Sequence, residues 1–564
     1  MKYKLSDKQS SWLVFGLLAL LIFGQTLLFD YFAFRAGLEP EAYSGLEITS
    51  MILSKIAAAV LFASFVFLLR DKRWILLLSF VIDTWFIANL IYMRNNHILL
   101  DAEAFNMSGN LHGYFWSVLI YIEWGIDLMF YVLTGLFGLI FLILPKKTER
   151  QGWVWLGMVG LSVVLRLVGE WCYVSDNSTA TYDPAPFIRE HREPVYGTHF
   201  PTTVQHTSVL YSPLYITTDY YLMINGLQPN RPLTDKDRSM IGQLDRVMLE
   251  KDPHLDSPLI IVLLESLENW VVTPQIMPNL YRLTQNEHVF YANSIHTQIV
   301  GAPSADGQMI VNTGLLPINA GGTCLHYYQN TYPGIMTLAP DSAYCLLPHD
   351  TCVWNQTHMS PAYGYDTTIC YSDVDTILFQ KLDSMVDDGI RYIQCITQST
   401  HAPFVNEKYS RLALPKDMPW VMYNFIRGFN ALDDGLGYFI RKLETDPKLQ
   451  QYTIVITGDH RILHYEKRQQ MQDYSDKHNM GLEPANDCLP LIIYSPKIKN
   501  NPRYTKDAYQ MDIFPTYKAL VGAKYYHWSG FGINLMDSTQ KRLITEDEAY
   551  PLSDKMIRNN YFAR

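Results

Sequence analysis

Five apolar runs, each long enough to cross a bilayer, occupy the first third of this 564-residue chain. A helix needs roughly 20 apolar residues to span the hydrocarbon core, and Trp and Tyr flank many of these runs, as they do where helices meet lipid headgroups. No cleavage pattern follows the first run, which favours a retained anchor. The runs lie at Trp12–Phe32, Met51–Leu69, Trp74–Met93, Phe115–Leu144 and Trp153–Trp171. Residues 1–172 are therefore predicted to form a transmembrane domain of five helices.

Basic residues in the short loops predict the orientation of these helices. They gather before the first run, between the second and third, and between the fourth and fifth: Lys2, Lys4, Lys8, Arg70, Lys72, Arg73, Lys146, Lys147 and Arg150. The loops on the opposite side are poorer in basic residues. By the positive-inside rule the amino terminus is cytoplasmic. Five crossings then place everything after about Cys172 on the extracytoplasmic side.

Four ionisable residues interrupt the apolar runs, and such residues are costly in lipid. Two interpretations are open for them. They form hydrogen bonds between helices inside the bundle, or they hold a lipid headgroup. Glu123 and Asp127 are four residues apart and so share one helix face. The four are Asp83, Glu123, Asp127 and Arg166.

The bulk composition argues against two classes of partner. The formal net charge is −10, whereas proteins that track nucleic-acid phosphates are usually basic. The seven cysteines avoid CxxC spacing, so a structural zinc cluster is not expected. Residues 173–256 mix polar and aromatic side chains and are predicted to be a connecting arm with one or two short helices.

From residue 257 onward the pattern is that of an α/β domain. Continuous apolar runs end abruptly in polar residues, as strands buried on both faces do. Helical stretches separate them, which predicts a mostly parallel sheet covered on both faces. We expect an α/β/α domain over residues 257–540 and a C-terminal tail over residues 541–564. The runs are "SPLIIVLLESLENW", "GIRYIQCITQSTHAPF", "YTIVITGDHR" and "CLPLIIYSPK".

Four polar residues stand just past the predicted strand ends: Glu265, His401, Asp459 and His460. Open α/β sheets bind ligands beyond the carboxyl ends of their strands, so these side chains are expected to converge. Two carboxylates and an imidazole suit one divalent ion of intermediate hardness, Mn²⁺ or Zn²⁺. Taken singly, each residue also has a simpler interpretation as a solvated strand-end charge or a loop-bonding histidine.

The stretch "HTQIVGAPSADGQM" contains a candidate nucleophile, Ser304. Ser304 begins a predicted helix, where anions are stabilised. A bound metal ion would lower the pKa of its hydroxyl and make it a competent nucleophile towards a phosphoryl group. Ser304 would then be both a catalytic residue and a metal ligand. The simpler interpretation is that Ser304 is only the helix N-cap.

Together these segments resemble the lipoteichoic acid synthase family of the alkaline phosphatase/sulfatase superfamily. The resemblance covers nearly the whole chain and is strongest from about 257 to 537. "LLESLENW" is similar to the family's first metal-ligand strand, "HTQIVGAPSADGQMIVNTGLLP" to its nucleophile segment, and "TGDHR" to its remaining ligands. "STHAPF" puts His401 where the family has a phosphate-contacting histidine. "QMDIFPTYKALVG" and "FGINLM" resemble its closing segments.

The resemblance also implies substrate contacts and shows two departures. "LPHDTCVWNQTHMSPAYGYD" resembles a substrate-binding stretch, with His349 and Trp354 as candidate contacts to glycerol phosphate. Gln356 stands where the family usually has an arginine, which removes a bidentate phosphate binder. Ser304 replaces the family's threonine but keeps the hydroxyl. His296, close before the nucleophile, is a further candidate for lining the pocket. The headgroup therefore stays open between phosphoglycerol, phosphoethanolamine and another alcohol phosphate.

The resemblance implies a two-step transfer at a bacterial-type cytoplasmic membrane. Ser304 attacks the phosphodiester of a phospholipid donor, takes the headgroup phosphate and releases diacylglycerol. A hydroxyl of an envelope glycan, lipid or polymer then displaces Ser304. His401 stabilises the phosphate oxygens or helps proton transfer.

Three other functions are weighed against this one. A sulfatase of the formylglycine type needs Cys or Ser followed by x-P-x-R, but Ala305, Asp306, Gly307 and Gln308 follow Ser304. A phosphodiesterase or phosphatase would differ only in using water as acceptor. A non-catalytic membrane binding or sensory protein would bind no Mn²⁺ or Zn²⁺. The cysteines of the predicted extracytoplasmic domain lie in a compartment where disulfides persist. Among them, Cys345–Cys352 is the first candidate for a disulfide, because the two residues are close in sequence.

Overall fold

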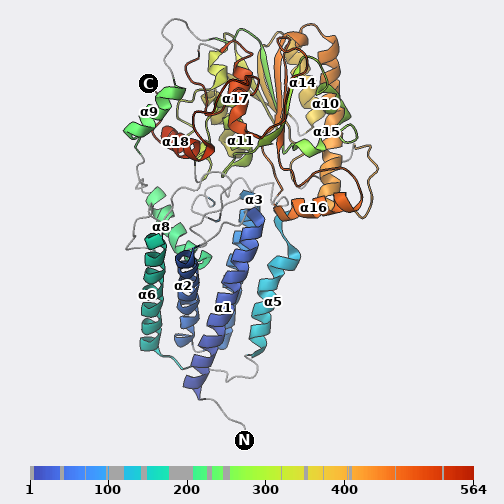
Figure 1. Ribbon diagram of the computed structural model, residues 1–564. Coiled ribbons are helices and arrows are strands. Elements are labelled where there is room, and N and C mark those ends of the chain that lie inside the picture. Colours follow the sequence, from blue (N-terminus) through green and yellow to red (C-terminus); the bar gives the residue numbers. More distant parts are fainter. Residues whose placement is uncertain are drawn as a thin grey trace. The chain divides into compact units, whose positions relative to one another are not determined.

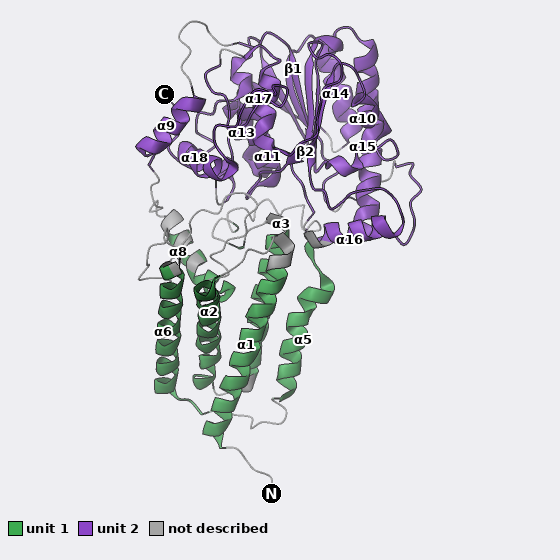
Figure 2. Cartoon of the chain, viewed as in Figure 1, with its two compact units in different colours: residues 1–108, 121–229 green, residues 109–120, 230–564 purple. Residues whose placement is uncertain are grey.

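The computed structural model forms two compact units, each described here by itself (Figure 2). Unit 1 comprises residues 1–108 and 121–229, and unit 2 comprises residues 109–120 and 230–564. The described residues are 6–37, 44–69, 71–96, 99–100, 104, 118, 120–140, 149–176, 208–224, 232–245, 254–318, 321–348, 353–371, 374–402, 404, 410–463, 465–523 and 526–563.

Unit 1 contains the apolar helices that the sequence predicts (Figure 1). Among the described residues, four helices are long and apolar enough to span a membrane, and α5 is a shorter apolar helix. Expected and observed positions coincide, although the number of full-length spans is four rather than five within the described ranges. The helices are α1 (Asp7–Gly37), α2 (Gly45–Ala63), α3 (Lys72–Asn96), α5 (Trp124–Ile140), α6 (Gly152–Asp176) and the short α8 (Ser212–Ile224).

The ionisable residues in these helices bond to other protein groups. Asp83 on α3 accepts a hydrogen bond from Gln25 Nε2 on α1 at 2.8 Å. Asp127 on α5 pairs with Arg94 on α3 at 2.9 Å. Both contacts join separate helices, as the first interpretation of these residues expected. Arg166 instead pairs with Glu170 of its own helix, one turn away, at 3.0 Å.

Unit 2 is built on a nine-stranded sheet with the order β4-β3-β5-β1-β6-β7-β2-β8, and β9 also pairs with β2. The central strands are apolar and wholly buried, which explains their continuous apolar runs. The strands are β1 (Leu259–Leu264), β2 (Val289–His296), β3 (Ala343–Pro348), β4 (Thr367–Tyr371), β5 (Tyr392–Ile396), β6 (Thr453–Gly458), β7 (Leu489–Tyr494), β8 (Arg503–Tyr504) and β9 (Ala508–Tyr509).

The sheet is mostly parallel, with one reversed strand. β1 is parallel to β5 and to β6, whereas β7 is antiparallel to both of its neighbours, β6 and β2. The end of β6, the end of β2 and the start of β7 therefore lie at the same edge of the sheet. The expectation of a mostly parallel sheet is confirmed, with β7 as the exception.

Helices cover the sheet on two sides (Figure 1). α10 and α14 both pack against the long α15, and α11 packs against α17. The covering helices are α10 (Pro278–Leu283), α11 (Pro303–Thr313), α14 (Asp375–Asp387), α15 (Trp420–Thr445) and α17 (Ile513–Lys518). The others in unit 2 are α9 (Asp235–Leu244), α12 (Thr323–His326), α13 (Gln356–Ala362), α16 (Tyr465–Lys477) and α18 (Glu546–Arg558).

The segment expected to be a C-terminal tail, residues 541–564, contributes α18 to the body of unit 2. One face of α18 is buried, including Tyr550 and Ile557, and the Tyr550 hydroxyl donates to the Gln298 carbonyl at 2.9 Å. Lys555 pairs with Asp237 of α9 at 2.9 Å. The segment packs because its apolar residues recur at helical spacing, so it is a helix of the domain rather than a separate tail.

The expected Cys345–Cys352 disulfide is not supported. Cys345 is a buried free thiol on β3, and Cys352 lies outside the described residues. Cys345 lies in the core of unit 2, so closeness in sequence to Cys352 did not predict its surroundings.

Candidate active site

Glu265 is the first residue after β1, and its backbone is held on both sides. Its N–H donates to Thr397 Oγ1 at 2.9 Å, and its carbonyl accepts from Thr400 Oγ1 at 2.6 Å. The next residue, Ser266, has φ 57°, a strained conformation for a non-glycine residue. Its N–H donates to Asp459 Oδ1 at 2.9 Å. These bonds tie the ends of β1, β5 and β6 together.

Ser304 lies in the first turn of α11, after a loop that Asp306 holds. One oxygen of Asp306 accepts the backbone N–H groups of Val300, Gly301 and Ala302 at 2.9, 3.1 and 3.1 Å. The helix begins with Pro303 and has Ala302 as its N-cap, an arrangement that suits proline. Ser304 is therefore not the N-cap, and its hydroxyl faces the sheet edge.

The helix that carries Ser304 approaches the end of β6 closely. A Cβ built on Gly307 would lie 2.1 Å from the carbonyl oxygen of Asp459, so only glycine fits there. Gln510 Nε2 donates to the same carbonyl at 2.6 Å. This close packing fixes the distance between Ser304 and the residues after β6.

The four expected core residues, Glu265, Ser304, Asp459 and His460, meet at this edge. Ser304 Oγ donates to Glu265 Oε2 at 3.3 Å and lies 3.2 Å from His460 Nε2. His460 Nε2 in turn lies 3.3 Å from Glu265 Oε1 and 3.6 Å from Asp459 Oδ2. Glu265, Asp459 and His460 are all at most 3% exposed. Residues from three segments, up to 195 positions apart in sequence (Glu265 to His460), thus form one cluster.

The donor set fits a divalent metal ion. One ligand atom from each of Glu265, Asp459 and His460 lies within 4.8 Å of the others. His460 bonds the Arg461 carbonyl through Nδ1 at 2.7 Å, which leaves Nε2 facing the carboxylates, as in metal-ligating histidines. Asp459 Oδ2 is buried and accepts no hydrogen bond from the described part of the chain. Two carboxylates, an imidazole and the Ser304 hydroxyl are suitable ligands for Mn²⁺ or Zn²⁺.

The electrostatics of the cluster show how strongly it favours positive charge. Burial opposes protonation of His460, but the carboxylates of Asp459 and Glu265 raise its pKa to about 10. Burial and the charge of Glu265 raise the pKa of Asp459 to about 7. Burial would raise the pKa of Glu265 as well, but the charge of His460 and, to a lesser extent, of His401 holds it well below its usual range. The negative charge that attracts these protons would equally attract a cation.

The other expected residues lie around this cluster or outside it. His401 follows β5 and bonds the Ala402 carbonyl through Nδ1 at 2.7 Å. Trp354 and Gln356 lie on another segment, in which Asn355 donates to the Cys324 carbonyl on α12 at 2.9 Å. His349 lies outside the described residues.

His296 belongs to a different group of side chains at the same sheet edge. It ends β2, and its ring lies beside Cys488 and Asp507. Within the part of the chain that the structure describes, His296 makes no contact with Ser304, so its expected place in the pocket stays a prediction.

Several residues that build the site were not anticipated from the sequence. Thr397 directly follows β5 and Ser266 is the second residue after β1, so the rule that singled out Glu265 could have included them. Asp306 was not predicted to hold the loop before Ser304, although it accepts three backbone N–H groups of that loop. Gln510 had no local signal, because it reaches the Asp459 carbonyl from a segment 51 residues away.

The fold and the site together define a class of protein. The arrangement is a mostly parallel sheet covered by helices, with two carboxylates and an imidazole around a hydroxyl at the strand ends, and members of the alkaline phosphatase/sulfatase superfamily, to which the sequence is similar, are metal-dependent. Residues 259–523 match the family model "Sulfatase". This match covers a little less than half of the chain, and the chain is also similar to a lipoteichoic acid synthase-like protein.

One curated relative and several solved structures are similar to the chain. The lipoteichoic acid synthase-like protein YvgJ of Bacillus subtilis (strain 168) is 24% identical over 314 residues, which cover 49% of each chain. The match thus spans about half the length of that relative. The lipoteichoic acid synthase LtaP of Listeria monocytogenes is 21% identical, with a TM-score of 0.46, over 58% of this chain and 97% of that chain. The phosphoethanolamine transferase EptA of Neisseria meningitidis is 14% identical, with a TM-score of 0.45, over 90% of this chain and 95% of that chain.

Proposed function

We propose that this chain transfers an alcohol-phosphate headgroup from a membrane phospholipid to an envelope glycan, lipid or polymer, through a covalent intermediate on Ser304. One observation carries the proposal. Ser304 Oγ lies within 3.3 Å of both Glu265 Oε2 and His460 Nε2, in a cluster where the buried Asp459 Oδ2 accepts no hydrogen bond from the described residues. A hydroxyl so placed is an activated nucleophile rather than a turn residue.

Glu265, Ser304, Asp459 and His460 would hold one divalent ion, Mn²⁺ or Zn²⁺. When bound, such an ion supplies Lewis-acid stabilisation of phosphoryl oxygens and lowers the pKa of the serine hydroxyl. Asp459 and Glu265 supply the negative charge that retains the cation. The hydrogen bond from His460 Nδ1 to the Arg461 carbonyl keeps its Nε2 aimed at the cluster.

In the first step the bond from Ser304 Oγ to phosphorus forms and the bond from phosphorus to the diacylglycerol oxygen breaks. The Ser304 proton, which Glu265 Oε2 accepts in a hydrogen bond, passes to solvent. His401 gives a proton to the leaving oxygen, since its Nδ1 is held by the Ala402 carbonyl and its Nε2 is the nitrogen left for substrate. Backbone N–H groups at the start of α11 stabilise the phosphoryl oxygens.

In the second step the acceptor hydroxyl gives its proton to His401 and its oxygen forms a bond to phosphorus. The bond from phosphorus to Ser304 Oγ breaks, and Ser304 Oγ takes up a proton from solvent. His349 and Trp354 are the proposed contacts of the donated headgroup. Gln356 contributes hydrogen bonds without charge, which lowers the preference for any one phosphate ester. We therefore propose glycerol phosphate and phosphoethanolamine as the two headgroups to test.

The proposed location is a bacterial-type cytoplasmic membrane with the catalytic unit on the extracytoplasmic side. The apolar helices of unit 1 and the distribution of basic residues between them support it. This location suits the reaction because the donor is a membrane lipid. The acceptor would belong to the envelope outside that membrane.

The full-length chain in detergent, incubated with labelled phosphatidylglycerol or phosphatidylethanolamine, tests this proposal. We expect diacylglycerol release from at least one lipid and its loss, by a factor of about 10⁴ or more, in Ser304→Ala. Label that enters only water-soluble alcohol phosphate, even with added acceptor, would instead indicate a phosphodiesterase. Diacylglycerol release that persists in Ser304→Ala would contradict the proposal.

A further inference from the structure

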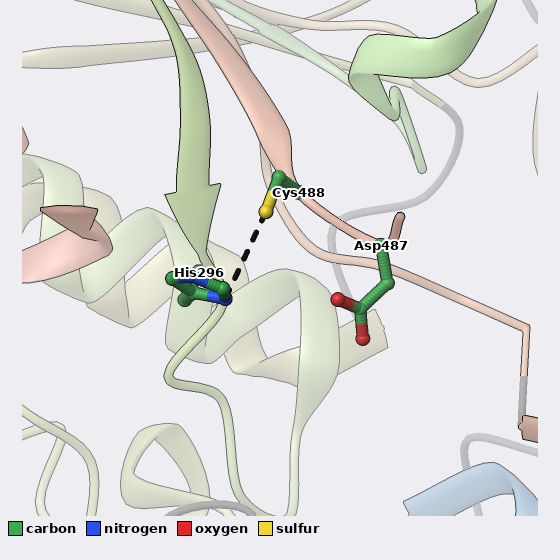
Figure 3. Close-up of side chains that lie close together, drawn as sticks. All are labelled: His296, Asp487 and Cys488. Carbon is green, nitrogen blue, oxygen red and sulfur yellow. Dashed lines mark hydrogen bonds between the residues drawn. The ribbon is translucent and has the colours of Figure 1, made fainter. Parts of the chain in front are cut away.

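Three side chains that the proposed reaction does not use in its chemistry meet at the same edge of the sheet (Figure 3). β2 ends at His296, and β7 begins directly after Cys488; the pairing of Ile295 with Leu489 brings the two strands together there. His296 Nδ1 lies 3.7 Å from Cys488 Sγ, and Asp487 points its carboxylate towards this pair. One ligand atom from each of the three lies within 4.8 Å of the others.

We propose that His296, Asp487 and Cys488 bind a second divalent cation, separate from the one at Glu265, Asp459 and His460. The distance between the ligand atoms of His296 and Cys488 suits an ion with tetrahedral coordination. With metal–sulfur and metal–nitrogen bonds of about 2.3 and 2.0 Å, a sulfur and a nitrogen ligand lie roughly 3.5 Å apart. The observed 3.7 Å between Nδ1 and Sγ is close to that sulfur–nitrogen distance. A carboxylate oxygen of Asp487 lies within 4.8 Å of the other two ligand atoms.

The orientation of His296 is what a metal ligand requires. Its other ring nitrogen, Nε2, lies 3.2 Å from Asp507 Oδ1, and Ser294 Oγ donates to the same oxygen at 3.0 Å. Asp507 thus accepts the Nε2 proton and leaves the Nδ1 lone pair directed at Cys488. A carboxylate behind a ligating histidine is the usual outer contact of a metal site, and here it is present in addition to the three ligands.

The charges near the cluster also match a divalent ion. Cys488 as thiolate, Asp487 and Asp507 carry three negative charges, and Arg461, which pairs with Asp487, carries one positive charge. A divalent cation neutralises the remaining two. Cys488 is buried, whereas the side chain of His296 is 40% exposed, so the fourth coordination position faces the solvent side.

The ligand types predict which ion this second site prefers. Thiolate and imidazole select Zn²⁺ or Co²⁺ over Mg²⁺, Ca²⁺ and Mn²⁺. The cluster of Glu265, Asp459 and His460 contains no sulfur, so the two sites are expected to differ in metal preference. A cation bound by His296 and Cys488 would join the end of β2 to the start of β7. It would also hold Arg461, the residue after His460, through Asp487.

Cobalt binding to the metal-free full-length chain in detergent tests this second site directly. Coordination of Co²⁺ by a thiolate gives a near-ultraviolet charge-transfer absorption that carboxylates and imidazoles do not produce. We expect this absorption in the wild type, its loss in Cys488→Ser and in His296→Ala, and its retention in Cys370→Ser, the exposed cysteine of β4. Asp507→Asn should weaken binding about 10- to 100-fold.

Unchanged near-ultraviolet circular dichroism in each variant will show that the fold is intact. Cobalt binding without the thiolate absorption in the wild type would overturn the proposal. An absorption that survives Cys488→Ser, or that survives His296→Ala, would overturn it as well. Because the signal requires a thiolate, these outcomes do not depend on whether the Ser304 reaction is as proposed.

Discussion

Asp306 fixes the position of Ser304 by accepting three backbone N–H groups with one oxygen. Asp306→Ala leaves these buried donors without an acceptor, and each costs about 1–3 kcal/mol. We expect the free energy of unfolding to fall by at least about 3 kcal/mol, with a large loss of transfer activity. Chemical denaturation and diacylglycerol release measure the two effects.

Asp306→Asn is the matched control, since it keeps an acceptor oxygen and removes only the charge. It should lose less stability than Asp306→Ala. Equal stability of Asp306→Ala and the wild type would show that the loop does not depend on these bonds.

His296 gives the metal-free chain a pH-dependent contribution to stability. Its hydrogen bonds, with Cys488 first and with Asp507 as well, raise its pKa from 6.5 to about 9 against the effect of burial. The folded state therefore holds the proton more tightly than the unfolded state. The stabilisation is complete below about pH 6.5 and is lost as the pH rises towards 9.

Melting temperatures of chelator-treated wild type and His296→Gln between pH 6 and 10 measure this contribution. The advantage of the wild type should be constant at the acid end and shrink above pH 6.5. Its size will be modest, because the side chain is 40% exposed and solvent screens the interaction. A difference that grows with pH would contradict this assignment.

Helix α11 is the element whose placement matters most, and Gly307 sets its distance from β6. Gly307→Ala would put a methyl group 2.1 Å from the Asp459 carbonyl oxygen, so the helix must move. A shift of about 1 Å at a reacting group can cost about 10²-fold in rate. We predict at least that loss in diacylglycerol release.

Gly242→Ala is the control for this substitution. Gly242 lies in α9, where an added Cβ meets nothing within 4 Å, and alanine favours a helix. The Gly242 variant should keep full activity. Full activity of Gly307→Ala would mean that α11 need not lie where the structure has it.

Helix α16 is held to the loop after β1 by a buried ion pair. Arg468 Nη1 and Nη2 bond the two oxygens of Glu268 at 2.9 and 2.5 Å. Arg468→Met would leave the Glu268 charge buried without its partner, which costs about 3–5 kcal/mol. Adding Glu268→Gln to that variant should recover part of the loss, and denaturant titration of the wild type and the two variants checks it. No recovery would mean that packing, rather than charge, dominates.

The sequence predicted the strand ends well and the relations between distant segments poorly. Glu265, Asp459 and His460 each follow an apolar run, and the end of that run predicted that they lie at the end of a strand. The direction of β7 had no such signal, because a strand buried on both faces has the same composition whichever way it runs. Asp507 and Gln510 were not predicted, since their contacts depend on how the last strands pair with β2.

At the scale of the whole molecule, membrane helices and a buried polar cluster occur in one chain. The cluster of Glu265, Ser304, Asp459 and His460 is proposed to need a divalent ion. Removal of metal with a chelator should abolish diacylglycerol release from phospholipid, and Mn²⁺ or Zn²⁺ should restore it. Turnover that continues after metal analysis shows none bound would contradict this dependence.

The central claim is that the headgroup passes through Ser304. The most direct test is mass spectrometry of the Ser304 peptide after brief incubation with phosphatidylglycerol or phosphatidylethanolamine and acid quench. We predict that this peptide gains the mass of the corresponding alcohol phosphate and that Ser304→Ala gains none. Diacylglycerol formed while the Ser304 peptide stays unmodified would contradict the account.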